Sequence, residues 1–264
     1  MSCTPSQLEE LVGEIAPWEL AEEWDNVGLL LGRRDQTVNR VLVALDVTEA
    51  VLEEARAFGA EAVVTHHPFM FKPVSRLTDE TREGRLMLEM ARLGMGHIAA
   101  HTNLDAAPEG VNETLLSLMG CTNLTGEGCL RVGDLEEMTF GELCRRAGER
   151  LHAQVRTYGE PDRLVHRLGC CSGAGSGEYA AALALGADCF LTGEVRHNLA
   201  LDALDAGLCI LEAGHFETER PVCAVVARSL QKRADALEYG LSVRVSQADV
   251  YNRAPSRRND FAAV

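Results

Sequence analysis

The sequence predicts an α/β protein built from two similar, duplicated domains, each a mainly parallel sheet with flanking helices. Three observations lead to this prediction. Short apolar runs alternate with amphipathic segments, which is typical of parallel strands joined by helices. This order of segments occurs twice along the chain. The chain also has 264 residues, 46% of them hydrophobic, which suffices for two packed cores in domains of about 100–200 residues.

The first half contains three predicted strands separated by helices. Thr48 and Gly59 are expected to begin and end one helix, because a hydroxyl caps exposed N–H groups and glycine tolerates the left-handed backbone at a helix end. Gly94 is expected to end the next helix in the same way. The predicted elements are a helix over 8–16, a strand over 41–47, a helix over 49–58, a strand over 62–65, a helix over 80–93 and a strand over 97–100.

The second half repeats this order of elements. Its glycines again punctuate the segments, with Gly186 at a predicted helix end. The predicted elements are a strand over 167–171, a helix over 177–185, a strand over 189–192, a helix over 196–206 and a strand over 208–213.

The two halves also match in sequence. GAEAVVTHH (59–67) aligns with GADCFLTGE (186–194), and AHTNLD (100–105) aligns with GHFETE (214–219). Both matches fall on equivalent predicted elements in the same order, so we infer a duplication. The predicted domains are 1–125 and 126–264, with the boundary inside the Gly-, Asn- and Thr-rich segment 120–135 and the end of the chain as an optional part of the first domain.

Charge and composition exclude several classes of function. The net charge is −15, which disfavours nucleic acid and anionic membranes as partners because both require a basic face. No apolar run is long enough to span a membrane, and the first residues lack the basic and apolar regions of a signal peptide, so the expected location is the cytoplasm. The nine cysteines form no CxxC pair and are expected to be buried thiols in a reducing compartment.

Polar residues follow the predicted strands, where parallel sheets gather their ligands. His66 and His67 are adjacent, and this pair taken alone has a second interpretation as a surface turn that holds two histidines. Histidine and carboxylate side chains without cysteine suit Zn²⁺, Mn²⁺, Fe²⁺, Co²⁺ or Ni²⁺. The residues at these positions are Asp46, His66, His67, His101, Asp105, Ser172, Glu194, His215 and Glu219.

Two pairs have a spacing that suits joint coordination. His101 and Asp105 are four residues apart, as are His215 and Glu219, and this spacing places both side chains of a pair on one face of a helical turn. Each pair alone has the alternative interpretation of a polar helix start. Their equivalence in the duplication favours a metal site, and two neighbouring cations would activate water for hydrolysis.

Two loops have two interpretations each. The stretch 169–178, GCCSGAGSGE, is either a tight strand-to-helix turn or a cradle in which Ser172, Gly173 and Gly175 bind a phosphate or carboxylate. The segment Trp24-Asp25-Asn26-Val27-Gly28 is either a turn that exposes polar groups or a packing site for its tryptophan.

Several motifs resemble those of the dinuclear-metal family of GTP cyclohydrolase 1 type 2 homologues, also called NIF-three-like proteins, in its short form. The resemblance spans nearly the whole chain and keeps the order of the motifs. They are EEWDNVGLLLG (22–32), LDVT (45–48), THHPFMFKPV (65–74), HTNLD (101–105), CSGAG (171–175), TGE (192–194) and GHFETERP (214–221).

This resemblance implies two similar α/β domains with a pair of metal ions in the cleft between them, and a toroidal homohexamer. It implies His66, His67, Asp105, His215 and Glu219 as ligands, with Glu219 as the bridge. His101 is either a further ligand or an acid/base group beside the metals. Arg196-His197-Asn198 departs from the aromatic residue and histidine that usually follow the TGE motif, so His197 is given no catalytic role.

Two functions of different class follow. The first is a hydrolase that uses two divalent cations on a small nucleotide-like or phosphorylated substrate, with ring-opening hydrolysis of GTP as the reaction that the family name suggests. His101 or Glu194 would be the general acid or base, and the Gly-rich loop would hold the anionic end of the substrate. The alternative is a non-enzymatic metal-binding or scaffold protein that forms a ring. Binding of DNA ranks third, because the chain is acidic.

Overall fold

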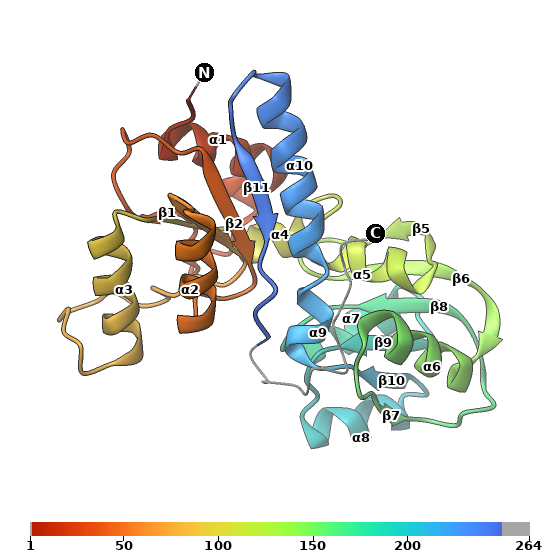
Figure 1. The fold of residues 1–264 in the computed structure, drawn as a ribbon. Coiled ribbons are helices and arrows are strands. Elements are labelled where there is room, and N and C mark those ends of the chain that lie inside the picture. Colours follow the sequence, from red (N-terminus) through yellow and green to blue (C-terminus); the bar gives the residue numbers. More distant parts are fainter. Residues whose placement is uncertain (1, 250–264) are drawn as a thin grey trace. The chain divides into compact units, whose positions relative to one another are not determined.

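The computed structural model describes residues 2–249, which form two compact units with one sheet each (Figure 1). The first unit comprises residues 2–107 and 223–249, and the second comprises residues 108–222. Both units have helices packed against their sheet, so the predicted α/β fold class is confirmed. Among the described residues, no helix combines the length and the apolar character that a membrane crossing requires.

The first unit is built on a five-stranded sheet of order β1-β4-β3-β2-β11. Strands β4, β3, β2 and β11 run parallel to one another, and the edge strand β1 is antiparallel to β4. Its elements are α1 (Pro5–Ile15), η1 (Trp18–Leu20), β1 (Gly28–Leu31), β2 (Arg40–Ala44), α2 (Glu49–Phe58), β3 (Ala62–Thr65), α3 (Arg82–Leu93), β4 (Gly96–Ala99), α4 (Thr102–Ala106), α10 (Val222–Ala236) and β11 (Ser242–Val245).

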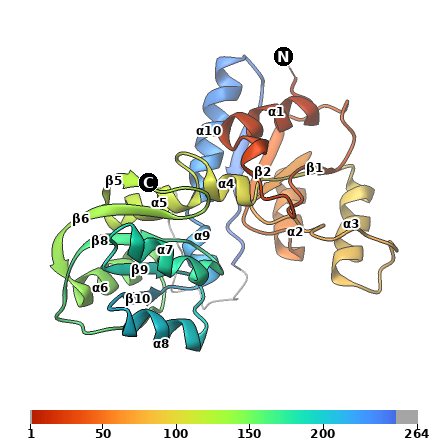
Figure 2. The ribbon, with the colours of Figure 1, turned by 180° about the vertical axis from the view of Figure 1, so that it is seen from behind.

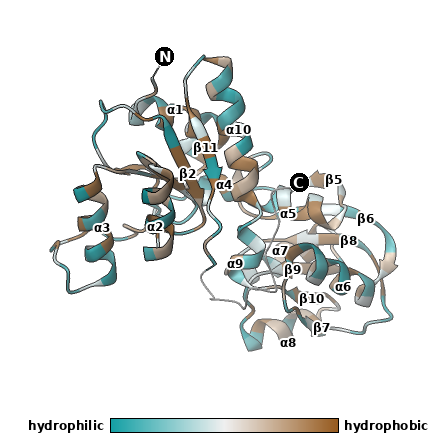
Figure 3. Ribbon diagram, viewed as in Figure 1, coloured by the Kyte–Doolittle hydropathy of each residue, from teal (hydrophilic) through white to brown (hydrophobic). Residues whose placement is uncertain are grey.

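Helices α2 and α3 cover one face of this sheet. Leu42 and Val63 of the strands pack with Leu52 of α2 and with Leu86 and Met90 of α3. Successive residues of a strand point to opposite faces of the sheet, so Val41, Val43 and Val64 point away from α2 and α3. These valines are buried as well, so the opposite face of the sheet is also covered. In Figure 3, β2 is coloured mainly as hydrophobic, whereas α2 and α3 carry both hydrophobic and hydrophilic residues.

The caps of α2 agree with the sequence prediction. The Thr48 hydroxyl accepts a hydrogen bond from the Val51 N–H, and Gly59 ends the helix with φ +70°. Such a cap stabilises a helix by about 1 kcal/mol because it satisfies an N–H that has no partner within the helix. Gly94 likewise ends α3 with φ +64°.

The second unit has a six-stranded sheet of order β5-β6-β8-β9-β10-β7. It is mixed rather than mainly parallel, because only the pairs β8–β9 and β9–β10 are parallel. Its elements are α5 (Val111–Met119), β5 (Thr122–Thr125), β6 (Arg131–Thr139), α6 (Phe140–Leu151), β7 (Arg156–Tyr158), β8 (Leu164–Cys170), η2 (Gly175–Glu178), α7 (Tyr179–Ala184), β9 (Cys189–Thr192), α8 (His197–Asp205), β10 (Cys209–Glu212) and α9 (His215–Glu219).

Helices cover both faces of this second sheet (Figure 2). Leu116 of α5 and Leu143 of α6 pack with Leu168 and Leu191 of the strands. On the opposite face, Ala182 of α7 and Ala203 of α8 pack with Phe190 and Ile210. The segment 120–135, where the sequence analysis placed the domain boundary, contains the antiparallel pairing of β5 with β6 inside this unit.

The two units share one succession of elements. In the first unit it is β2-α2-β3-α3-β4-α4, and in the second it is β8-α7-β9-α8-β10-α9, with three parallel strands in the same order in both. The third strand is followed in each case by a helix of five residues, and the predicted histidine lies at its N-terminal cap in the first unit and at its first position in the second. This correspondence is what the internal sequence match predicted.

Candidate metal centre

His66 and His67 lie directly after β3, where the strand ends. Their N–H groups donate to the carbonyl oxygens of Ala44 and Leu45, at 3.3 and 2.9 Å. Adjacent residues of a regular strand point to opposite faces, so two imidazoles can meet only if the strand bends. The chain does bend here, and the two ring centroids are 4.9 Å apart.

A third imidazole joins them from the short helix after β4. His101 is the N-terminal cap residue of α4, and its ring centroid is 5.1 Å from that of His66 and 5.6 Å from that of His67. One ring nitrogen from each of the three histidines lies within 4.8 Å of the others. Asp105, one turn further along α4, places Oδ1 3.7 Å from Nε2 of His66. The first unit therefore gathers four of the predicted site residues.

All three imidazoles are held by their Nδ1 atoms. Nδ1 of His66 is 3.0 Å from the carbonyl oxygen of Ala100, that of His67 is 2.9 Å from Asp46 Oδ1, and that of His101 is 2.9 Å from Asp25 Oδ1. These oxygens can only accept, so each Nδ1 is the donor, and a neutral imidazole with Nδ1–H has its lone pair on Nε2. A hydrogen-bonded Nδ1–H is the usual support of a histidine that binds metal through Nε2.

Asp25 is a functional candidate that the sequence analysis did not assign. Its carboxylate is fully buried and accepts four hydrogen bonds, from His101 Nδ1, from the Asn26 N–H, and from the N–H and hydroxyl of Thr102. Burial would raise the pKa of Asp25, but the hydrogen bonds from His101 and Thr102 outweigh it and hold that pKa well below its usual range. Asp25 is therefore charged and orients His101.

The second unit holds an equivalent histidine–carboxylate pair. His215 begins α9, and its Nε2 lies 3.2 Å from Oε2 of Glu219, one turn along the same helix. Nδ1 of His215 is 3.0 Å from Oε1 of Glu194, which follows β9. Glu219 is buried, whereas the side chain of Glu194 is 61% exposed. Glu194 thus orients His215 in the way that Asp25 orients His101.

The Gly-rich loop packs directly against this pair. Gly173 has φ +56°, and a Cβ added there would overlap Glu219 Oε1 and lie 3.0 Å from His215 Nε2. The amides of Ser172, Gly173 and Gly175 donate to Asn112 Oδ1, Thr218 Oγ1 and the Ser172 carbonyl, respectively. These three N–H groups therefore have acceptors within the unit, and the glycine at 173 provides room for the two ligand side chains.

The donor chemistry of both groups fits divalent cations. Each group offers imidazole nitrogens and carboxylate oxygens, which suit Zn²⁺, Mn²⁺, Fe²⁺, Co²⁺ and Ni²⁺. Among the described residues, no cysteine belongs to the groups that could hold a metal, and burial raises the pKa of Cys121 and Cys144 to about 12, which keeps those two thiols protonated. The residues present therefore fit the metal that the sequence predicted.

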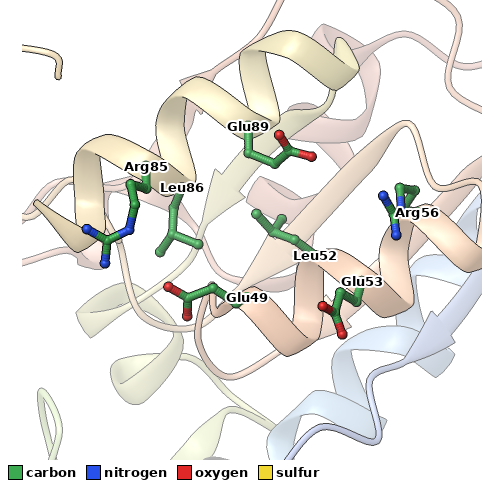
Figure 4. A pocket seen from close by; sticks show the side chains of 7 residues that line it. All are labelled: Glu49, Leu52, Glu53, Arg56, Arg85, Leu86 and Glu89. Atoms are coloured by element: carbon green, nitrogen blue, oxygen red, sulfur yellow. The ribbon is translucent and has the colours of Figure 1, made fainter. Parts of the chain in front are cut away.

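A groove of about 330 Å³ elsewhere in the first unit carries no comparable chemistry. It lies between α2 and α3, and Figure 4 shows Leu52 and Leu86 there among charged side chains. Three glutamates and two arginines line it, so its charges largely cancel. The lining residues are Glu49, Leu52, Glu53, Arg56, Arg85, Leu86 and Glu89.

His97 is a buried histidine of the first unit, and its burial predicts a pH dependence of stability. It is fully buried on β4, its Nε2 is 2.7 Å from Thr65 Oγ1, and burial lowers its pKa to about 3. In the unfolded chain, the pKa of a histidine is about 6.5. Between pH about 6.5 and about 3, the unfolded state therefore binds a proton at His97 that the folded state does not bind. The unfolding free energy consequently falls as the pH drops through this range. In His97→Gln we expect this slope to decrease by up to about 1.4 kcal/mol per pH unit.

Urea unfolding in EDTA across this pH range measures the slope. His166→Gln is the matched control, because it makes the same substitution at a side chain that is 56% exposed. Equal slopes in the His97→Gln variant and the unaltered chain would mean that His97 is protonated in the folded protein.

Comparisons with known proteins identify relatives over most of the chain. The family model described as Duf34/NIF3 (NGG1p interacting factor 3) matches residues 3–251. A GTP cyclohydrolase 1 type 2 homologue of Clostridium acetobutylicum is 30% identical over 95% of this chain and 98% of its own length. A NIF3 homologue of Schizosaccharomyces pombe is 31% identical over 86% of this chain and 90% of its own.

Solved structures show the same fold. A hypothetical protein of Staphylococcus aureus superposes with a TM-score of 0.90 at 26% identity, covering 96% of this chain and 99% of its own. Reduced HcgD from Methanocaldococcus jannaschii superposes with a TM-score of 0.75 at 26% identity, covering 93% and 98%. The fold, the ordered histidines and the match over almost the whole sequence lead to one conclusion: the chain belongs to the Duf34/NIF3 family.

Proposed function

We propose that this chain binds a pair of divalent cations and acts as a metal-dependent hydrolase of a small nucleotide-like or phosphorylated substrate. The observation that carries the proposal is the common arrangement of four histidines, His66, His67, His101 and His215. Each has Nδ1 within hydrogen-bond distance of an oxygen acceptor, which is the usual support of a histidine that binds metal through Nε2. Surface histidines have no need of such ordered support.

The proposed ligands are those that the family resemblance implies. His66, His67 and Asp105 would come from the first unit, and His215 and Glu219 from the second, with Glu219 as the bridging carboxylate. The position of Glu219 supports this role, because its buried carboxylate lies 3.2 Å from Nε2 of His215, so the two side chains offer neighbouring ligand atoms. His101 offers a third nitrogen to the first group, and its two proposed roles are a ligand and an acid/base group.

The chain's own residues would prepare the site for hydrolysis. A divalent cation held there supplies a water of lowered pKa and polarises the bond to be cleaved. Asp25, Asp46 and Glu194 orient the imidazoles through Nδ1, so the ligand atoms need little rearrangement when the ion binds. The exposure of Glu194 favours it as the group that exchanges a proton with solvent.

The substrate class rests on the relatives. Several of them are named GTP cyclohydrolase 1 type 2 homologues, so ring-opening hydrolysis of GTP is the first reaction to assay. We also propose a homohexamer in the cytoplasm, without a nucleic-acid or membrane partner. The net charge of −15 supports the last point. The buried free thiols of Cys3, Cys189 and Cys209 support a reducing compartment.

The metal content of the purified protein tests the proposed metal site. Elemental analysis of the purified full chain should give two cations per chain, and His66→Ala and His215→Ala should each lower that content. His166→Ala, which removes an exposed histidine of the second unit, should leave it unchanged. Unchanged metal content in both His66→Ala and His215→Ala would contradict the proposal.

Activity separates the two classes of function. The metal-loaded chain is assayed against GTP and a panel of phosphate esters, with His66→Ala as the background. Product above that background is expected for the hydrolase. Two bound cations without product would instead support the alternative, in which the metals serve a ring-forming scaffold or a metal-binding protein.

A further inference from the structure

Two large aromatic side chains of the first unit stay exposed beside the histidine cluster. Trp24 is 60% exposed and Phe71 is 43% exposed, although each is large enough to add much to a core. Their ring centroids are 5.8 Å apart. Both rings also contact His101 edge-on, at centroid distances of 6.3 Å for Trp24 and 6.1 Å for Phe71. The aromatic pair Trp24–Phe71 therefore adjoins a residue of the candidate metal centre.

Polar anchors hold this aromatic pair in place. Asp25, the next residue after Trp24, is fixed by its four hydrogen bonds, two of them from Thr102. The Asn26 side chain donates to the carbonyl oxygen of Met70, the residue before Phe71, at 2.5 Å. The two segments that carry the rings are thus bonded to each other and to the base of α4. Binding loses less conformational entropy when the contacting groups are ordered beforehand.

The position of the pair indicates what it contacts. Two exposed rings on a remote surface would suit a protein partner equally well, but these rings touch a histidine whose Nε2 belongs to the ligand group. A ligand bound at His101 would lie next to both rings, whose centroids are 6.3 and 6.1 Å from that of the imidazole. Aromatic rings bind other planar rings by stacking or edge contacts at centroid distances of about 4.5–7 Å. Saturated or purely anionic molecules gain little from such a surface.

We propose that Trp24 and Phe71 bind the planar heteroaromatic ring of the substrate and place it beside His101. This inference rests on the proposed function in that the molecule concerned is the substrate of the same site. It adds that the substrate carries an aromatic ring and that two named residues select it. A phosphate ester without a ring would then be a poor ligand.

Equilibrium binding to the metal-loaded full chain tests the inference without reliance on turnover. The probes are guanosine 5′-monophosphate and ribose 5-phosphate, which differ in the ring, and isothermal titration calorimetry gives their Kd values. The nucleotide should bind at least about tenfold more tightly. Trp24→Ala and Phe71→Ala should each raise its Kd about ten- to one-hundredfold and leave the Kd of ribose 5-phosphate unchanged, because stacking of one base gives about this effect.

Conservative and control variants complete the test. Trp24→Phe should recover most of the affinity, since it keeps an aromatic face. Leu77→Ala should change nothing, although Leu77 is an exposed apolar residue of comparable exposure in the same unit. Metal content and sedimentation are measured for every variant.

Three results would overturn the inference. The first is equal affinity of the unaltered chain for the two probes. The second is a Trp24→Ala variant that changes only the oligomeric state, which would assign the rings to contact with another copy. The third is loss of metal from that variant, which would mean that Trp24 acts through His101. Binding of the nucleotide through Trp24 without turnover would uphold the aromatic contact while the hydrolase proposal fails.

Discussion

Replacement of Gly173 with alanine is expected to disrupt the ligand pair of the second unit. The new Cβ would overlap Glu219 Oε1 and lie 3.0 Å from His215 Nε2, and the backbone at φ +56° is unfavourable for alanine. Since Glu219 is buried, its side chain has little room to move away. We expect the metal affinity to fall at least about tenfold and the unfolding free energy to fall by about 2 kcal/mol. Equilibrium dialysis with Mn²⁺ and urea unfolding measure the two effects.

Gly177→Ala provides a control from the same loop region. An added Cβ at Gly177 has no heavy atom of the described residues within 4 Å, so metal affinity should stay as it is. If Gly173→Ala bound Mn²⁺ as tightly as Gly177→Ala, the proposed contact of the loop with the ligand pair would be wrong. A loss of stability in both variants would point to the backbone of the loop instead.

Asp25→Asn should have the second large effect. The four donors around the carboxylate occupy both of its oxygens, so either orientation of an amide places its NH₂ against other donors. We expect the unfolding free energy to fall by about 3 kcal/mol, because buried donors lose their acceptor. Metal affinity should fall by about ten- to one-hundredfold, since His101 loses the group that orients it.

The matched control for this variant is Asp35→Asn. Asp35 belongs to the same unit and pairs with Arg33, but both side chains are 76% exposed, and such pairs contribute about 0–1 kcal/mol. If Asp25→Asn lowered stability and left metal affinity unchanged, Asp25 would be a structural anchor of its loop and would have no part in ordering the ligands.

Much of the fold could be predicted because local signals and tertiary packing agree. The helix over 49–58 has a threonine cap, an apolar face and a terminal glycine, and it occurs with those bounds. The antiparallel strands of the second sheet gave no comparable signal. Strand β5 is mostly exposed and polar, and β7 has only three residues, so neither shows a clear alternation of apolar and polar side chains.

The site divides in the same way. His66, His67 and His101 could be found because they follow strands, where the order of a parallel sheet brings residues together. Asp25 could not, because its partner His101 is 76 residues away and a single acidic residue in an early loop carries no spacing pattern. Asp25 lies within the motif EEWDNVGLLLG (22–32), but that motif assigns it no role, and packing of Trp24 was an alternative interpretation of the segment.

The pairing of β11 with β2 has a consequence for how the protein is made. Strand β2 begins at Arg40 and its neighbour β11 at Ser242, whereas residues 108–222 form an uninterrupted insert between them. At about 5–20 residues per second, a ribosome needs on the order of 10–40 s to deliver the missing edge strand. During that interval the insert can fold, while strand β2 of the first unit still has no partner on the side where β11 will pair. Chaperone binding or premature termination in this period would decide the fate of the nascent polypeptide.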